Sequence, residues 1–188
     1  ARFAAQNWDS LPKPFRRYAY GPVFRNEKPG PGRLREFMLC DADIVGSDRP
    51  EADAEMIALA VAGFKALNVP VRIRVNNRKL LNGLLTSLGV ADPAQQLGVL
   101  RAIDKLDRFG IEGVRLLLGA GRRDDSGDFT KGAMLPDAAI QPVLDFVGAG
   151  GAATRAAVLN RLADVLARSP EGQAGVEDLG RIDAAALV

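Results

Sequence analysis

The amino-acid sequence predicts an α+β fold, with part of an antiparallel sheet near the N-terminus and a mainly helical region after it. Residues 15–24 and 34–45 are rich in apolar, aromatic and β-branched side chains, and a loop rich in proline and glycine separates them. From residue 50 onward, apolar residues recur mostly at helical spacing. After residue 111 no run alternates convincingly as a strand does, so helices should predominate there.

The two N-terminal strands are expected to form a hairpin. Pro22 places the end of the first strand at an edge or a bulge, because proline cannot donate to a ladder. Residues 26–32 contain two prolines and two glycines and form the loop. The side chains of the returning strand, over 34–45, alternate between two faces. The face expected to pack on a core carries Met38, Cys40, Ala42 and Ile44, and the face expected to meet solvent or a cavity carries Phe37, Leu39, Asp41 and Asp43.

Helices are expected over most of the remaining chain. The first should begin at Asp48, as an N-cap with Glu51 as its capping-box partner, and end at 68–70. The alternation over 71–75 predicts a strand, and the polar stretch 119–132 predicts a solvated loop. Further helices are expected over 78–88 (ending at Gly89), 93–108 (ending at Gly110), 112–118, 136–147 and 153–167, with Ser169 and Pro170 stopping the last and only weak helices near 176 and 182.

The composition excludes several kinds of chemistry. The chain has no histidine and one cysteine, Cys40, which rules out internal disulfides, zinc sites built from Cys and His, and Ser-His-Asp or Cys-His catalysis. The net charge of +2 gives no broad basic field, so any contact with nucleic acid must be local. No window approaches the ~18 uninterrupted apolar residues of a membrane span. We therefore expect no binding to a membrane, and because the low use of cysteine suits a reducing compartment, we expect a cytoplasmic protein.

The chemistry is expected at the hairpin loop. Arg25 and Glu27 stand where the first strand meets the loop, and Arg33 stands where the loop ends. Arginines beside a loop can grip phosphates with two hydrogen bonds, an aromatic ring at Phe37 can stack on a base, and carboxylates further along can hold an amine. No helix follows the loop, so it is not a Walker or Rossmann phosphate site. The alternative is a solvated loop followed by the wet face of a strand.

Residues 20–46 (YGPVFRNEKPGPGRLREFMLCDADIVG) resemble motif 2 of class II aminoacyl-tRNA synthetases in its histidyl-specific form. Residues 75–85 resemble the strand-to-helix segment of that family, and 102–108 resemble the segment that opens its helical insertion. The resemblance implies that residues 1–110 belong to a partial class II antiparallel sheet with motif 2. It implies that residues 111–188 form a mainly α-helical insertion domain.

The resemblance also implies residue roles. Arg25 matches the catalytic arginine that contacts the α-phosphate of ATP and the carboxylate of histidine, and Glu27 matches the residue near the adenine amino group. Arg33 matches the arginine that reaches the γ-phosphate, and Phe37 matches the ring that stacks on adenine. Asp43 matches the carboxylate that binds the substrate histidine. No metal-ligating residue is implied.

One position departs from the family pattern. The family usually has Gln where this chain has Leu39. This position belongs to the implied histidine-binding set, together with Arg25 and Asp43. Leucine neither donates nor accepts a hydrogen bond, and an unpaired polar group in a binding site costs about 1–3 kcal/mol. The alternative function is therefore a non-catalytic, histidine-sensing regulatory paralogue, similar to the synthetase-like subunit of ATP phosphoribosyltransferase.

The resemblance places this chain inside a larger enzyme. Such a parent activates histidine with ATP and Mg²⁺ to histidyl-adenylate, transfers it to tRNA(His), and acts as a homodimer. The loop 28–32 would approach the acceptor end, and the chain, which lacks other family motifs, is expected to be inactive by itself. In the insertion, Arg155, Arg161 and Arg168 are candidate contacts to tRNA. A further alternative for 111–188 is a helical module that only binds RNA or protein.

Overall fold

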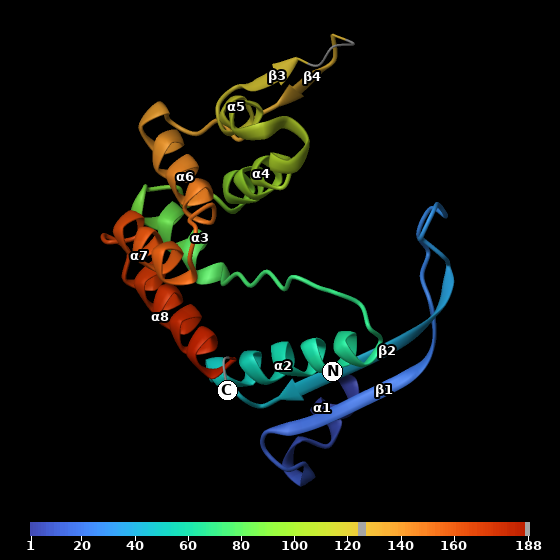
Figure 1. The fold of residues 1–188 in the computed structure, drawn as a ribbon. Coiled ribbons are helices and arrows are strands. Elements are labelled where there is room, and N and C mark those ends of the chain that lie inside the picture. Colours follow the sequence, from blue (N-terminus) through green and yellow to red (C-terminus); the bar gives the residue numbers. More distant parts are fainter. Residues whose placement is uncertain (124–126, 187–188) are drawn as a thin grey trace. The chain divides into compact units, whose positions relative to one another are not determined.

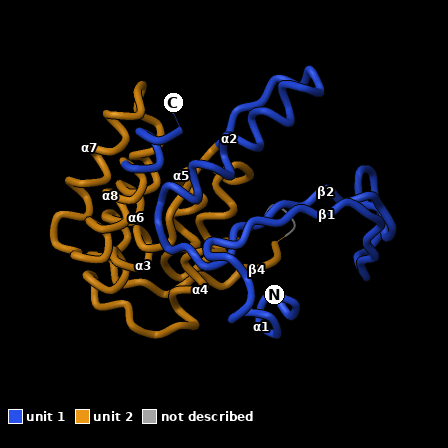
Figure 2. The backbone as a smooth tube through the Cα atoms, turned by 90° about the horizontal axis from the view of Figure 1, so that it is seen from below, with its two compact units in different colours: residues 1–73, 181–188 blue, residues 74–180 orange. Residues whose placement is uncertain are grey.

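The structure is a computed structural model that describes residues 1–123 and 127–186 and has an α+β fold (Figure 1). It contains two compact units, which are residues 1–73 with 181–188, and residues 74–180 (Figure 2). Compactness therefore divides the chain near residue 74. The domain boundary predicted at residue 110 comes from the resemblance to the synthetase family and not from the compactness of the chain. It therefore stays a prediction.

The first unit is built on the predicted hairpin. It contains α1 (Arg2–Gln6), a 3₁₀ turn (Trp8–Ser10), β1 (Phe15–Phe24), β2 (Glu36–Val45) and α2 (Pro50–Ala66). The strands β1 and β2 pair antiparallel in an unbroken register that runs from Phe15 opposite Val45 to Phe24 opposite Glu36. Both predicted strands are confirmed, although β2 begins at Glu36 and not at residue 34.

The two faces of the hairpin differ from the expected pattern of burial. Ala42 and Ile44 are partly buried and line a shallow cavity with Met56 of α2, as expected of a core-facing set. Met38 on the same face is 53% exposed, and Cys40 is also exposed. The prediction that Met38 and Cys40 pack in a core is therefore wrong for this chain, because α2 covers only the end of β2 that carries Ile44.

The helix α2 begins at Pro50, and the prediction of Asp48 as its N-cap is wrong. Arg49 is the N-cap and makes no side-chain cap bond. A proline is preorganised for the first helical position and lacks the N–H that would otherwise be unsatisfied there, so it sets the start. The helix ends as predicted, because Asn68 adopts a left-handed conformation with φ of 55°.

Two arginines hold α2 through exposed carboxylates. Arg16 of β1 donates two hydrogen bonds to Glu55, at 2.6 and 2.8 Å. Arg181 donates to Glu51 at 2.7 and 2.9 Å. The hydrogen bonds from Arg181 and Arg16 hold the pKa of Glu51 and of Glu55, respectively, below the ordinary value of a glutamate. These pairs tie α2 to β1 and to the end of the chain within the first unit.

Residues 71–75 do not form the predicted strand. Among the described residues, the ladders join β1 to β2 and β3 (Gly121–Arg123) to β4 (Phe129–Lys131), and neither includes this segment. Val71 and Val75 are 43% and 44% exposed. The alternating pattern is genuine, but a strand needs a partner for its N–H and C=O groups, and the described chain offers none.

The second unit is mostly helical, as predicted. Its helices are α3 (Arg78–Ser87), α4 (Pro93–Ile103), α5 (Leu106–Leu118), α6 (Asp137–Ala149), α7 (Arg155–Val165) and most of α8 (Pro170–Ala185). The predicted helix over 93–108 breaks early, after Ile103, and Gly110 kinks α5 with φ of 66°. The short β3–β4 hairpin lies inside the predicted loop 119–132, so the prediction of no strand after 111 is wrong.

The helix α8 overturns the prediction made for Ser169 and Pro170. The sequence predicts that these two residues stop a helix and that only weak helices follow them. Instead Ser169 Oγ accepts a hydrogen bond from the Gly172 N–H at 3.0 Å, and Pro170 begins a 16-residue helix. Ser-Pro is both a stop and a start signal, because proline cannot continue a helix but fits its first position.

A leucine-rich core holds the second unit together. A side chain at Gly83 of α3 would clash with Ser169 Oγ, so glycine permits α3 to approach the start of α8 closely. No described helix is long and apolar enough to span a membrane. The largest fully buried side chains are Leu80, Leu84, Leu85, Leu118, Leu166, Val99, Val114 and Val143.

Candidate functional site

Four of the predicted site residues gather at the loop end of the hairpin. The N–H of Arg25 donates to the carbonyl of Arg35 at 2.8 Å, which continues the hairpin beyond the last paired residues. The Arg25 guanidinium carbon lies 5.4 Å from the centre of the Phe37 ring. This distance suits a cation–π contact. Arg25 therefore lies on the same face of the hairpin as Phe37.

Glu27 lies between two arginines. Arg25 Nη1 is 3.6 Å from one carboxylate oxygen of Glu27, and Arg33 Nη1 is 3.9 Å from the other. The side chains of Arg25, Glu27 and Arg33 are 55%, 44% and 74% exposed, so these pairs are loose and screened by water. The two guanidinium groups are consequently free to turn toward an anionic ligand without losing strong contacts.

The far end of the same face carries acidic groups. Asp43 accepts a hydrogen bond from Arg17 Nη1 at 2.5 Å, and Asp41 lies 3.9 Å from the same nitrogen. Arg17 and Asp43 are directly opposite each other in the β1–β2 register. Residues six apart on one strand are separated by about 20 Å. Phe37 and Asp43 thus mark two ends of one extended face.

The middle of this face is open. Leu39 is partly buried and lies opposite Gly21. A side chain at Gly21 would meet nothing within 4 Å. Because directly opposed residues point to the same face of a hairpin, an unfilled space lies beside Leu39, between the arginine end and the carboxylate end.

The structure thus places Arg25, Phe37, Leu39 and Asp43 on one face, as the alternation over 34–45 predicts. Arg17 lies on this face too, and it is not among the predicted site residues. The predicted strands, 15–24 and 34–45, are unequal in length and leave the register open, and the structure sets residue 17 against residue 43. The roles that the resemblance implies for these residues stay predictions.

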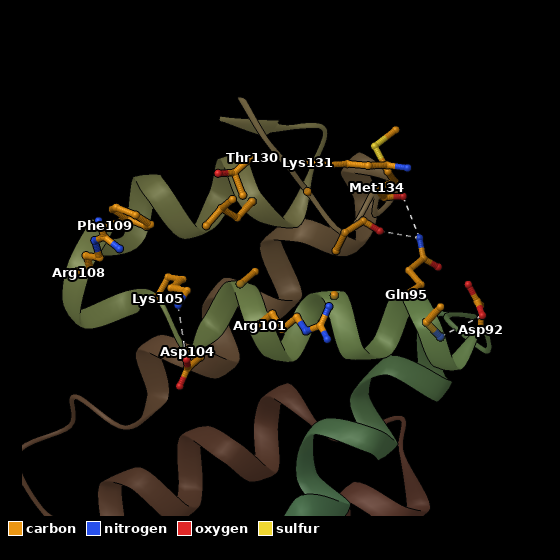
Figure 3. A pocket seen from close by; sticks show the side chains of 16 residues that line it. Asp92, Gln95, Arg101, Asp104, Lys105, Arg108, Phe109, Thr130, Lys131 and Met134 are labelled. Carbon is orange, nitrogen blue, oxygen red and sulfur yellow. Dashed lines mark hydrogen bonds and ion pairs between the residues drawn. The ribbon is translucent and has the colours of Figure 1, made fainter. Parts of the chain in front are cut away.

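The second unit has a basic cleft of about 880 Å³ between α4, α5 and the segment that leaves β4 (Figure 3). Gln95 donates to the carbonyls of Ala133 and Met134, at 3.2 and 2.9 Å, and so ties α4 to that segment. Within the described residues, neither Arg101 nor Lys131 has an ion-pair partner. The cationic side chains that line this basic cleft are Arg101, Lys105, Arg108 and Lys131, and the acidic ones are Asp92 and Asp104.

The arginines of this region that were predicted to contact tRNA lie elsewhere. Arg155, Arg161 and Arg168 are exposed, but none of them lines the basic cleft. The sequence signal for the cleft was the spacing of Arg101, Lys105 and Arg108 by four and three residues. Among the residues that the structure describes, no group of three or more His, Cys, Asp and Glu side chains is placed to hold a metal ion.

Comparison with known proteins gives a consistent result. The profile of a family described as "Histidyl-tRNA synthetase" matches residues 1–187. A "Histidine--tRNA ligase" of Caulobacter vibrioides is 64% identical over 188 residues, and one of Brucella suis biovar 1 is 53% identical over 190 residues. Each match covers 98% of this chain but 38% of the relative.

A solved structure shares the fold. The histidyl-tRNA synthetase from Nostoc sp. PCC 7120 is 27% identical to this chain, with a TM-score of 0.76. That match covers 98% of this chain and 39% of the Nostoc chain. The present chain therefore spans less than two fifths of the length of the relatives that it matches.

Proposed function

Because the chain belongs to the histidyl-tRNA synthetase family, we propose that the longer protein around it activates histidine with ATP and transfers the histidyl group to tRNA(His). The observation that carries this proposal is the single face on which Arg25 lies over Phe37 and from which Asp43 projects further along. That face offers cations and a ring at one end and carboxylates at the other, with open space between them.

The loop end of the hairpin suits ATP. In the proposed reaction the carboxylate of histidine attacks the α-phosphorus and pyrophosphate leaves, so negative charge grows on the phosphate oxygens. A guanidinium held at Arg25 offsets that charge, and Arg33 would hold the γ-phosphate. Phe37 would stack on adenine beside Glu27. Mg²⁺ would be bound chiefly by the phosphates of ATP, as is usual for this ion.

The other end suits the amino acid. Asp43 would accept a hydrogen bond from the imidazole N–H of histidine, the part of the substrate farthest from its carboxylate, and Arg25 would contact that carboxylate. Leu39 lies between these groups and supplies apolar contact in place of a hydrogen bond. A guanidinium and a carboxylate in this order bind histidine by its carboxylate and by its imidazole ring.

A regulatory paralogue that senses histidine and charges nothing is the second candidate, and Leu39 is the observation that favours it. The names of the relatives favour the ligase, since chains 53–64% identical to this one are histidine–tRNA ligases. The paired arginines at the ATP end also favour the ligase. A sensor of histidine alone has no need of a γ-phosphate contact.

Histidine-dependent exchange of pyrophosphate into ATP tests the proposed function. We expect the longer protein, in the cytoplasm and as a homodimer, to catalyse this exchange. The chain of 188 residues alone should give no exchange above background, because it spans 38% of the relatives' length. A longer protein that binds histidine without exchange would be the regulatory paralogue instead, and exchange by the 188 residues alone would overturn the expected inactivity.

We further propose that the basic cleft of the second unit contacts the phosphates of tRNA. Four cationic and two acidic side chains line this cleft, which has a volume of about 880 Å³. Arg101 and Lys131 have no ion-pair partner in the described part of the chain, so a phosphate would not need to displace one. Each phosphate that a protein neutralises releases a condensed counterion, which makes binding dependent on salt.

Binding of tRNA(His) by the longer protein at several salt concentrations tests the cleft. Replacing Arg101, Arg108 and Lys131 together by alanine should weaken binding and reduce the slope of log K against log [salt] by about 2 to 3. The matched control replaces the exposed arginines outside the cleft, Arg155, Arg161 and Arg168. A larger loss of slope in this control than in the cleft variant would contradict the assignment.

A further inference from the structure

The short hairpin of β3 and β4 carries an exposed aromatic ring beside the basic cleft. Phe129, the first residue of β4, is 56% exposed. The next two residues of the strand, Thr130 and Lys131, line the cleft (Figure 3). The proposed contact between the cleft and phosphates gives this ring no role. A single exposed apolar side chain is ordinary on a protein surface, so the surroundings of the ring decide whether it is a binding site.

The two faces of this hairpin have different surroundings. In the ladder Arg122 lies opposite Thr130, and Arg123 lies opposite Phe129. The Arg122 guanidinium carbon is 4.1 Å from the centre of the Phe109 ring, which anchors that face of the hairpin on α5. Because side chains alternate between the faces of a strand, Arg123 and Phe129 emerge from the other face. The ring of Phe129 is therefore directed away from the contact with α5.

The hairpin supports the ring of Phe129. A Cβ at Gly121 would lie 2.9 Å from Phe129 Cζ, so the ring extends across the strand pair over a glycine. The Arg123 guanidinium carbon is 5.9 Å from the ring centre, and its Nη1 donates to the carbonyl of Gly127 at 3.1 Å. Lys131, two residues further along β4, belongs to the same face by alternation. The ring thus rests on the backbone and has two cations on its own face.

We infer that Phe129 stacks on an unpaired base of the tRNA whose phosphates occupy the basic cleft. The inference rests on the proposed contact between the cleft and tRNA. Unpaired bases stack on exposed aromatic side chains, and cations beside the ring bind the phosphates that flank the stacked base. A base inside a helix is already stacked on both sides and offers the ring no free surface. The ligand of Phe129 is therefore a single-stranded part of the RNA.

Binding of tRNA(His) by the longer protein tests this inference. Phe129→Leu keeps an apolar side chain but removes the flat ring, and it should weaken binding about tenfold. The slope of log K against log [salt] should stay unchanged, because the substitution removes no charge. Phe129→Tyr, which keeps a ring, should bind tRNA(His) as tightly as the parent does.

A fully paired RNA duplex and a matched variant serve as controls. The parent and Phe129→Leu should bind the duplex equally well, because it contains no unpaired base. The matched variant is Leu116→Ala, which removes a similarly exposed side chain (52%) from α5, outside the lining of the cleft. This variant should leave the binding of both RNAs unchanged. Equal losses of affinity for tRNA and duplex in Phe129→Leu, or tRNA binding within about twofold of the parent's, would overturn the inference.

The cleft variant that replaces Arg101, Arg108 and Lys131 separates failure of the inference from failure of the proposed cleft. If that variant lowers the salt slope and Phe129→Leu leaves the affinity for tRNA unchanged, the stacking role is wrong and the cleft stands. If neither variant alters binding, both the cleft and the ring are misassigned. Unchanged tRNA affinity in Phe129→Leu with a lower unfolding temperature would show that the ring packs against protein, which also overturns the inference.

Discussion

Replacing Arg25 by alanine should lower kcat/KM for histidine-dependent ATP–pyrophosphate exchange by about a thousandfold in the longer protein. This factor corresponds to about 4 kcal/mol of lost transition-state stabilisation. The physical reason is that Arg25 lies over Phe37 at the loop end, where the proposed reaction develops charge on the α-phosphate. Arg25→Lys should recover little, because an ammonium cannot replace the planar fork of a guanidinium.

The control for this prediction is Arg16→Ala, in the strand that leads to Arg25. Arg16 is also an exposed arginine in an ion pair, but it contacts Glu55 on the other face. Thermal unfolding of both variants would show whether either loses folded structure. Exchange that survives Arg25→Ala within about tenfold of the parent's rate would mean that another group stabilises the α-phosphate.

Replacing Asp43 by asparagine should raise the KM for histidine by about 30- to 100-fold, with little change in the KM for ATP. A hydrogen bond to a charged group contributes about 2–3 kcal/mol, and asparagine keeps the shape of the side chain while removing its charge. Leu39 makes this dependence stronger, because it supplies no second hydrogen bond to the substrate. Exchange kinetics with varied histidine at saturating ATP measure the effect.

Glu36→Gln is the matched control for Asp43→Asn. Glu36 belongs to the same strand and loses the same charge, but it is exposed on the opposite face, across from Phe24. An equal increase in the KM for histidine in both variants would point to long-range charge rather than to a contact at Asp43.

The hairpin and its site face were predictable because a strand is recognised from the alternation of its own residues. Alternation with period two assigns Phe37 and Asp43 to one face of the predicted strand over 34–45. The pairing of Arg17 with Asp43 depends on the register of the hairpin, which the predicted strands of unequal length, 15–24 and 34–45, leave open. What alternation does not provide is which face is covered, and Met38 and Cys40 are accordingly exposed where burial was predicted.

Other features depend on contacts that local patterns do not encode. Residues 71–75 have the alternation of a strand but no described partner, so they remain unpaired. The strands β3 and β4 have three residues each, too few for any periodicity to emerge. In the basic cleft, the packing of α4 and α5 places Arg101 and Lys131 in one lining. Local hydrophobic periodicity does not predict contacts between residues that are so far apart in the sequence.

The most direct measurement is a crystal structure of the longer protein with a non-hydrolysable analogue of histidyl-adenylate. We expect the analogue on the face that carries Phe37, Leu39 and Asp43, with its phosphate mimic within hydrogen-bond distance of Arg25. Its adenine should stack on Phe37, and its imidazole should lie against Asp43. An analogue bound on the opposite face, beside Tyr20 and Met38, would contradict the assignment of the site.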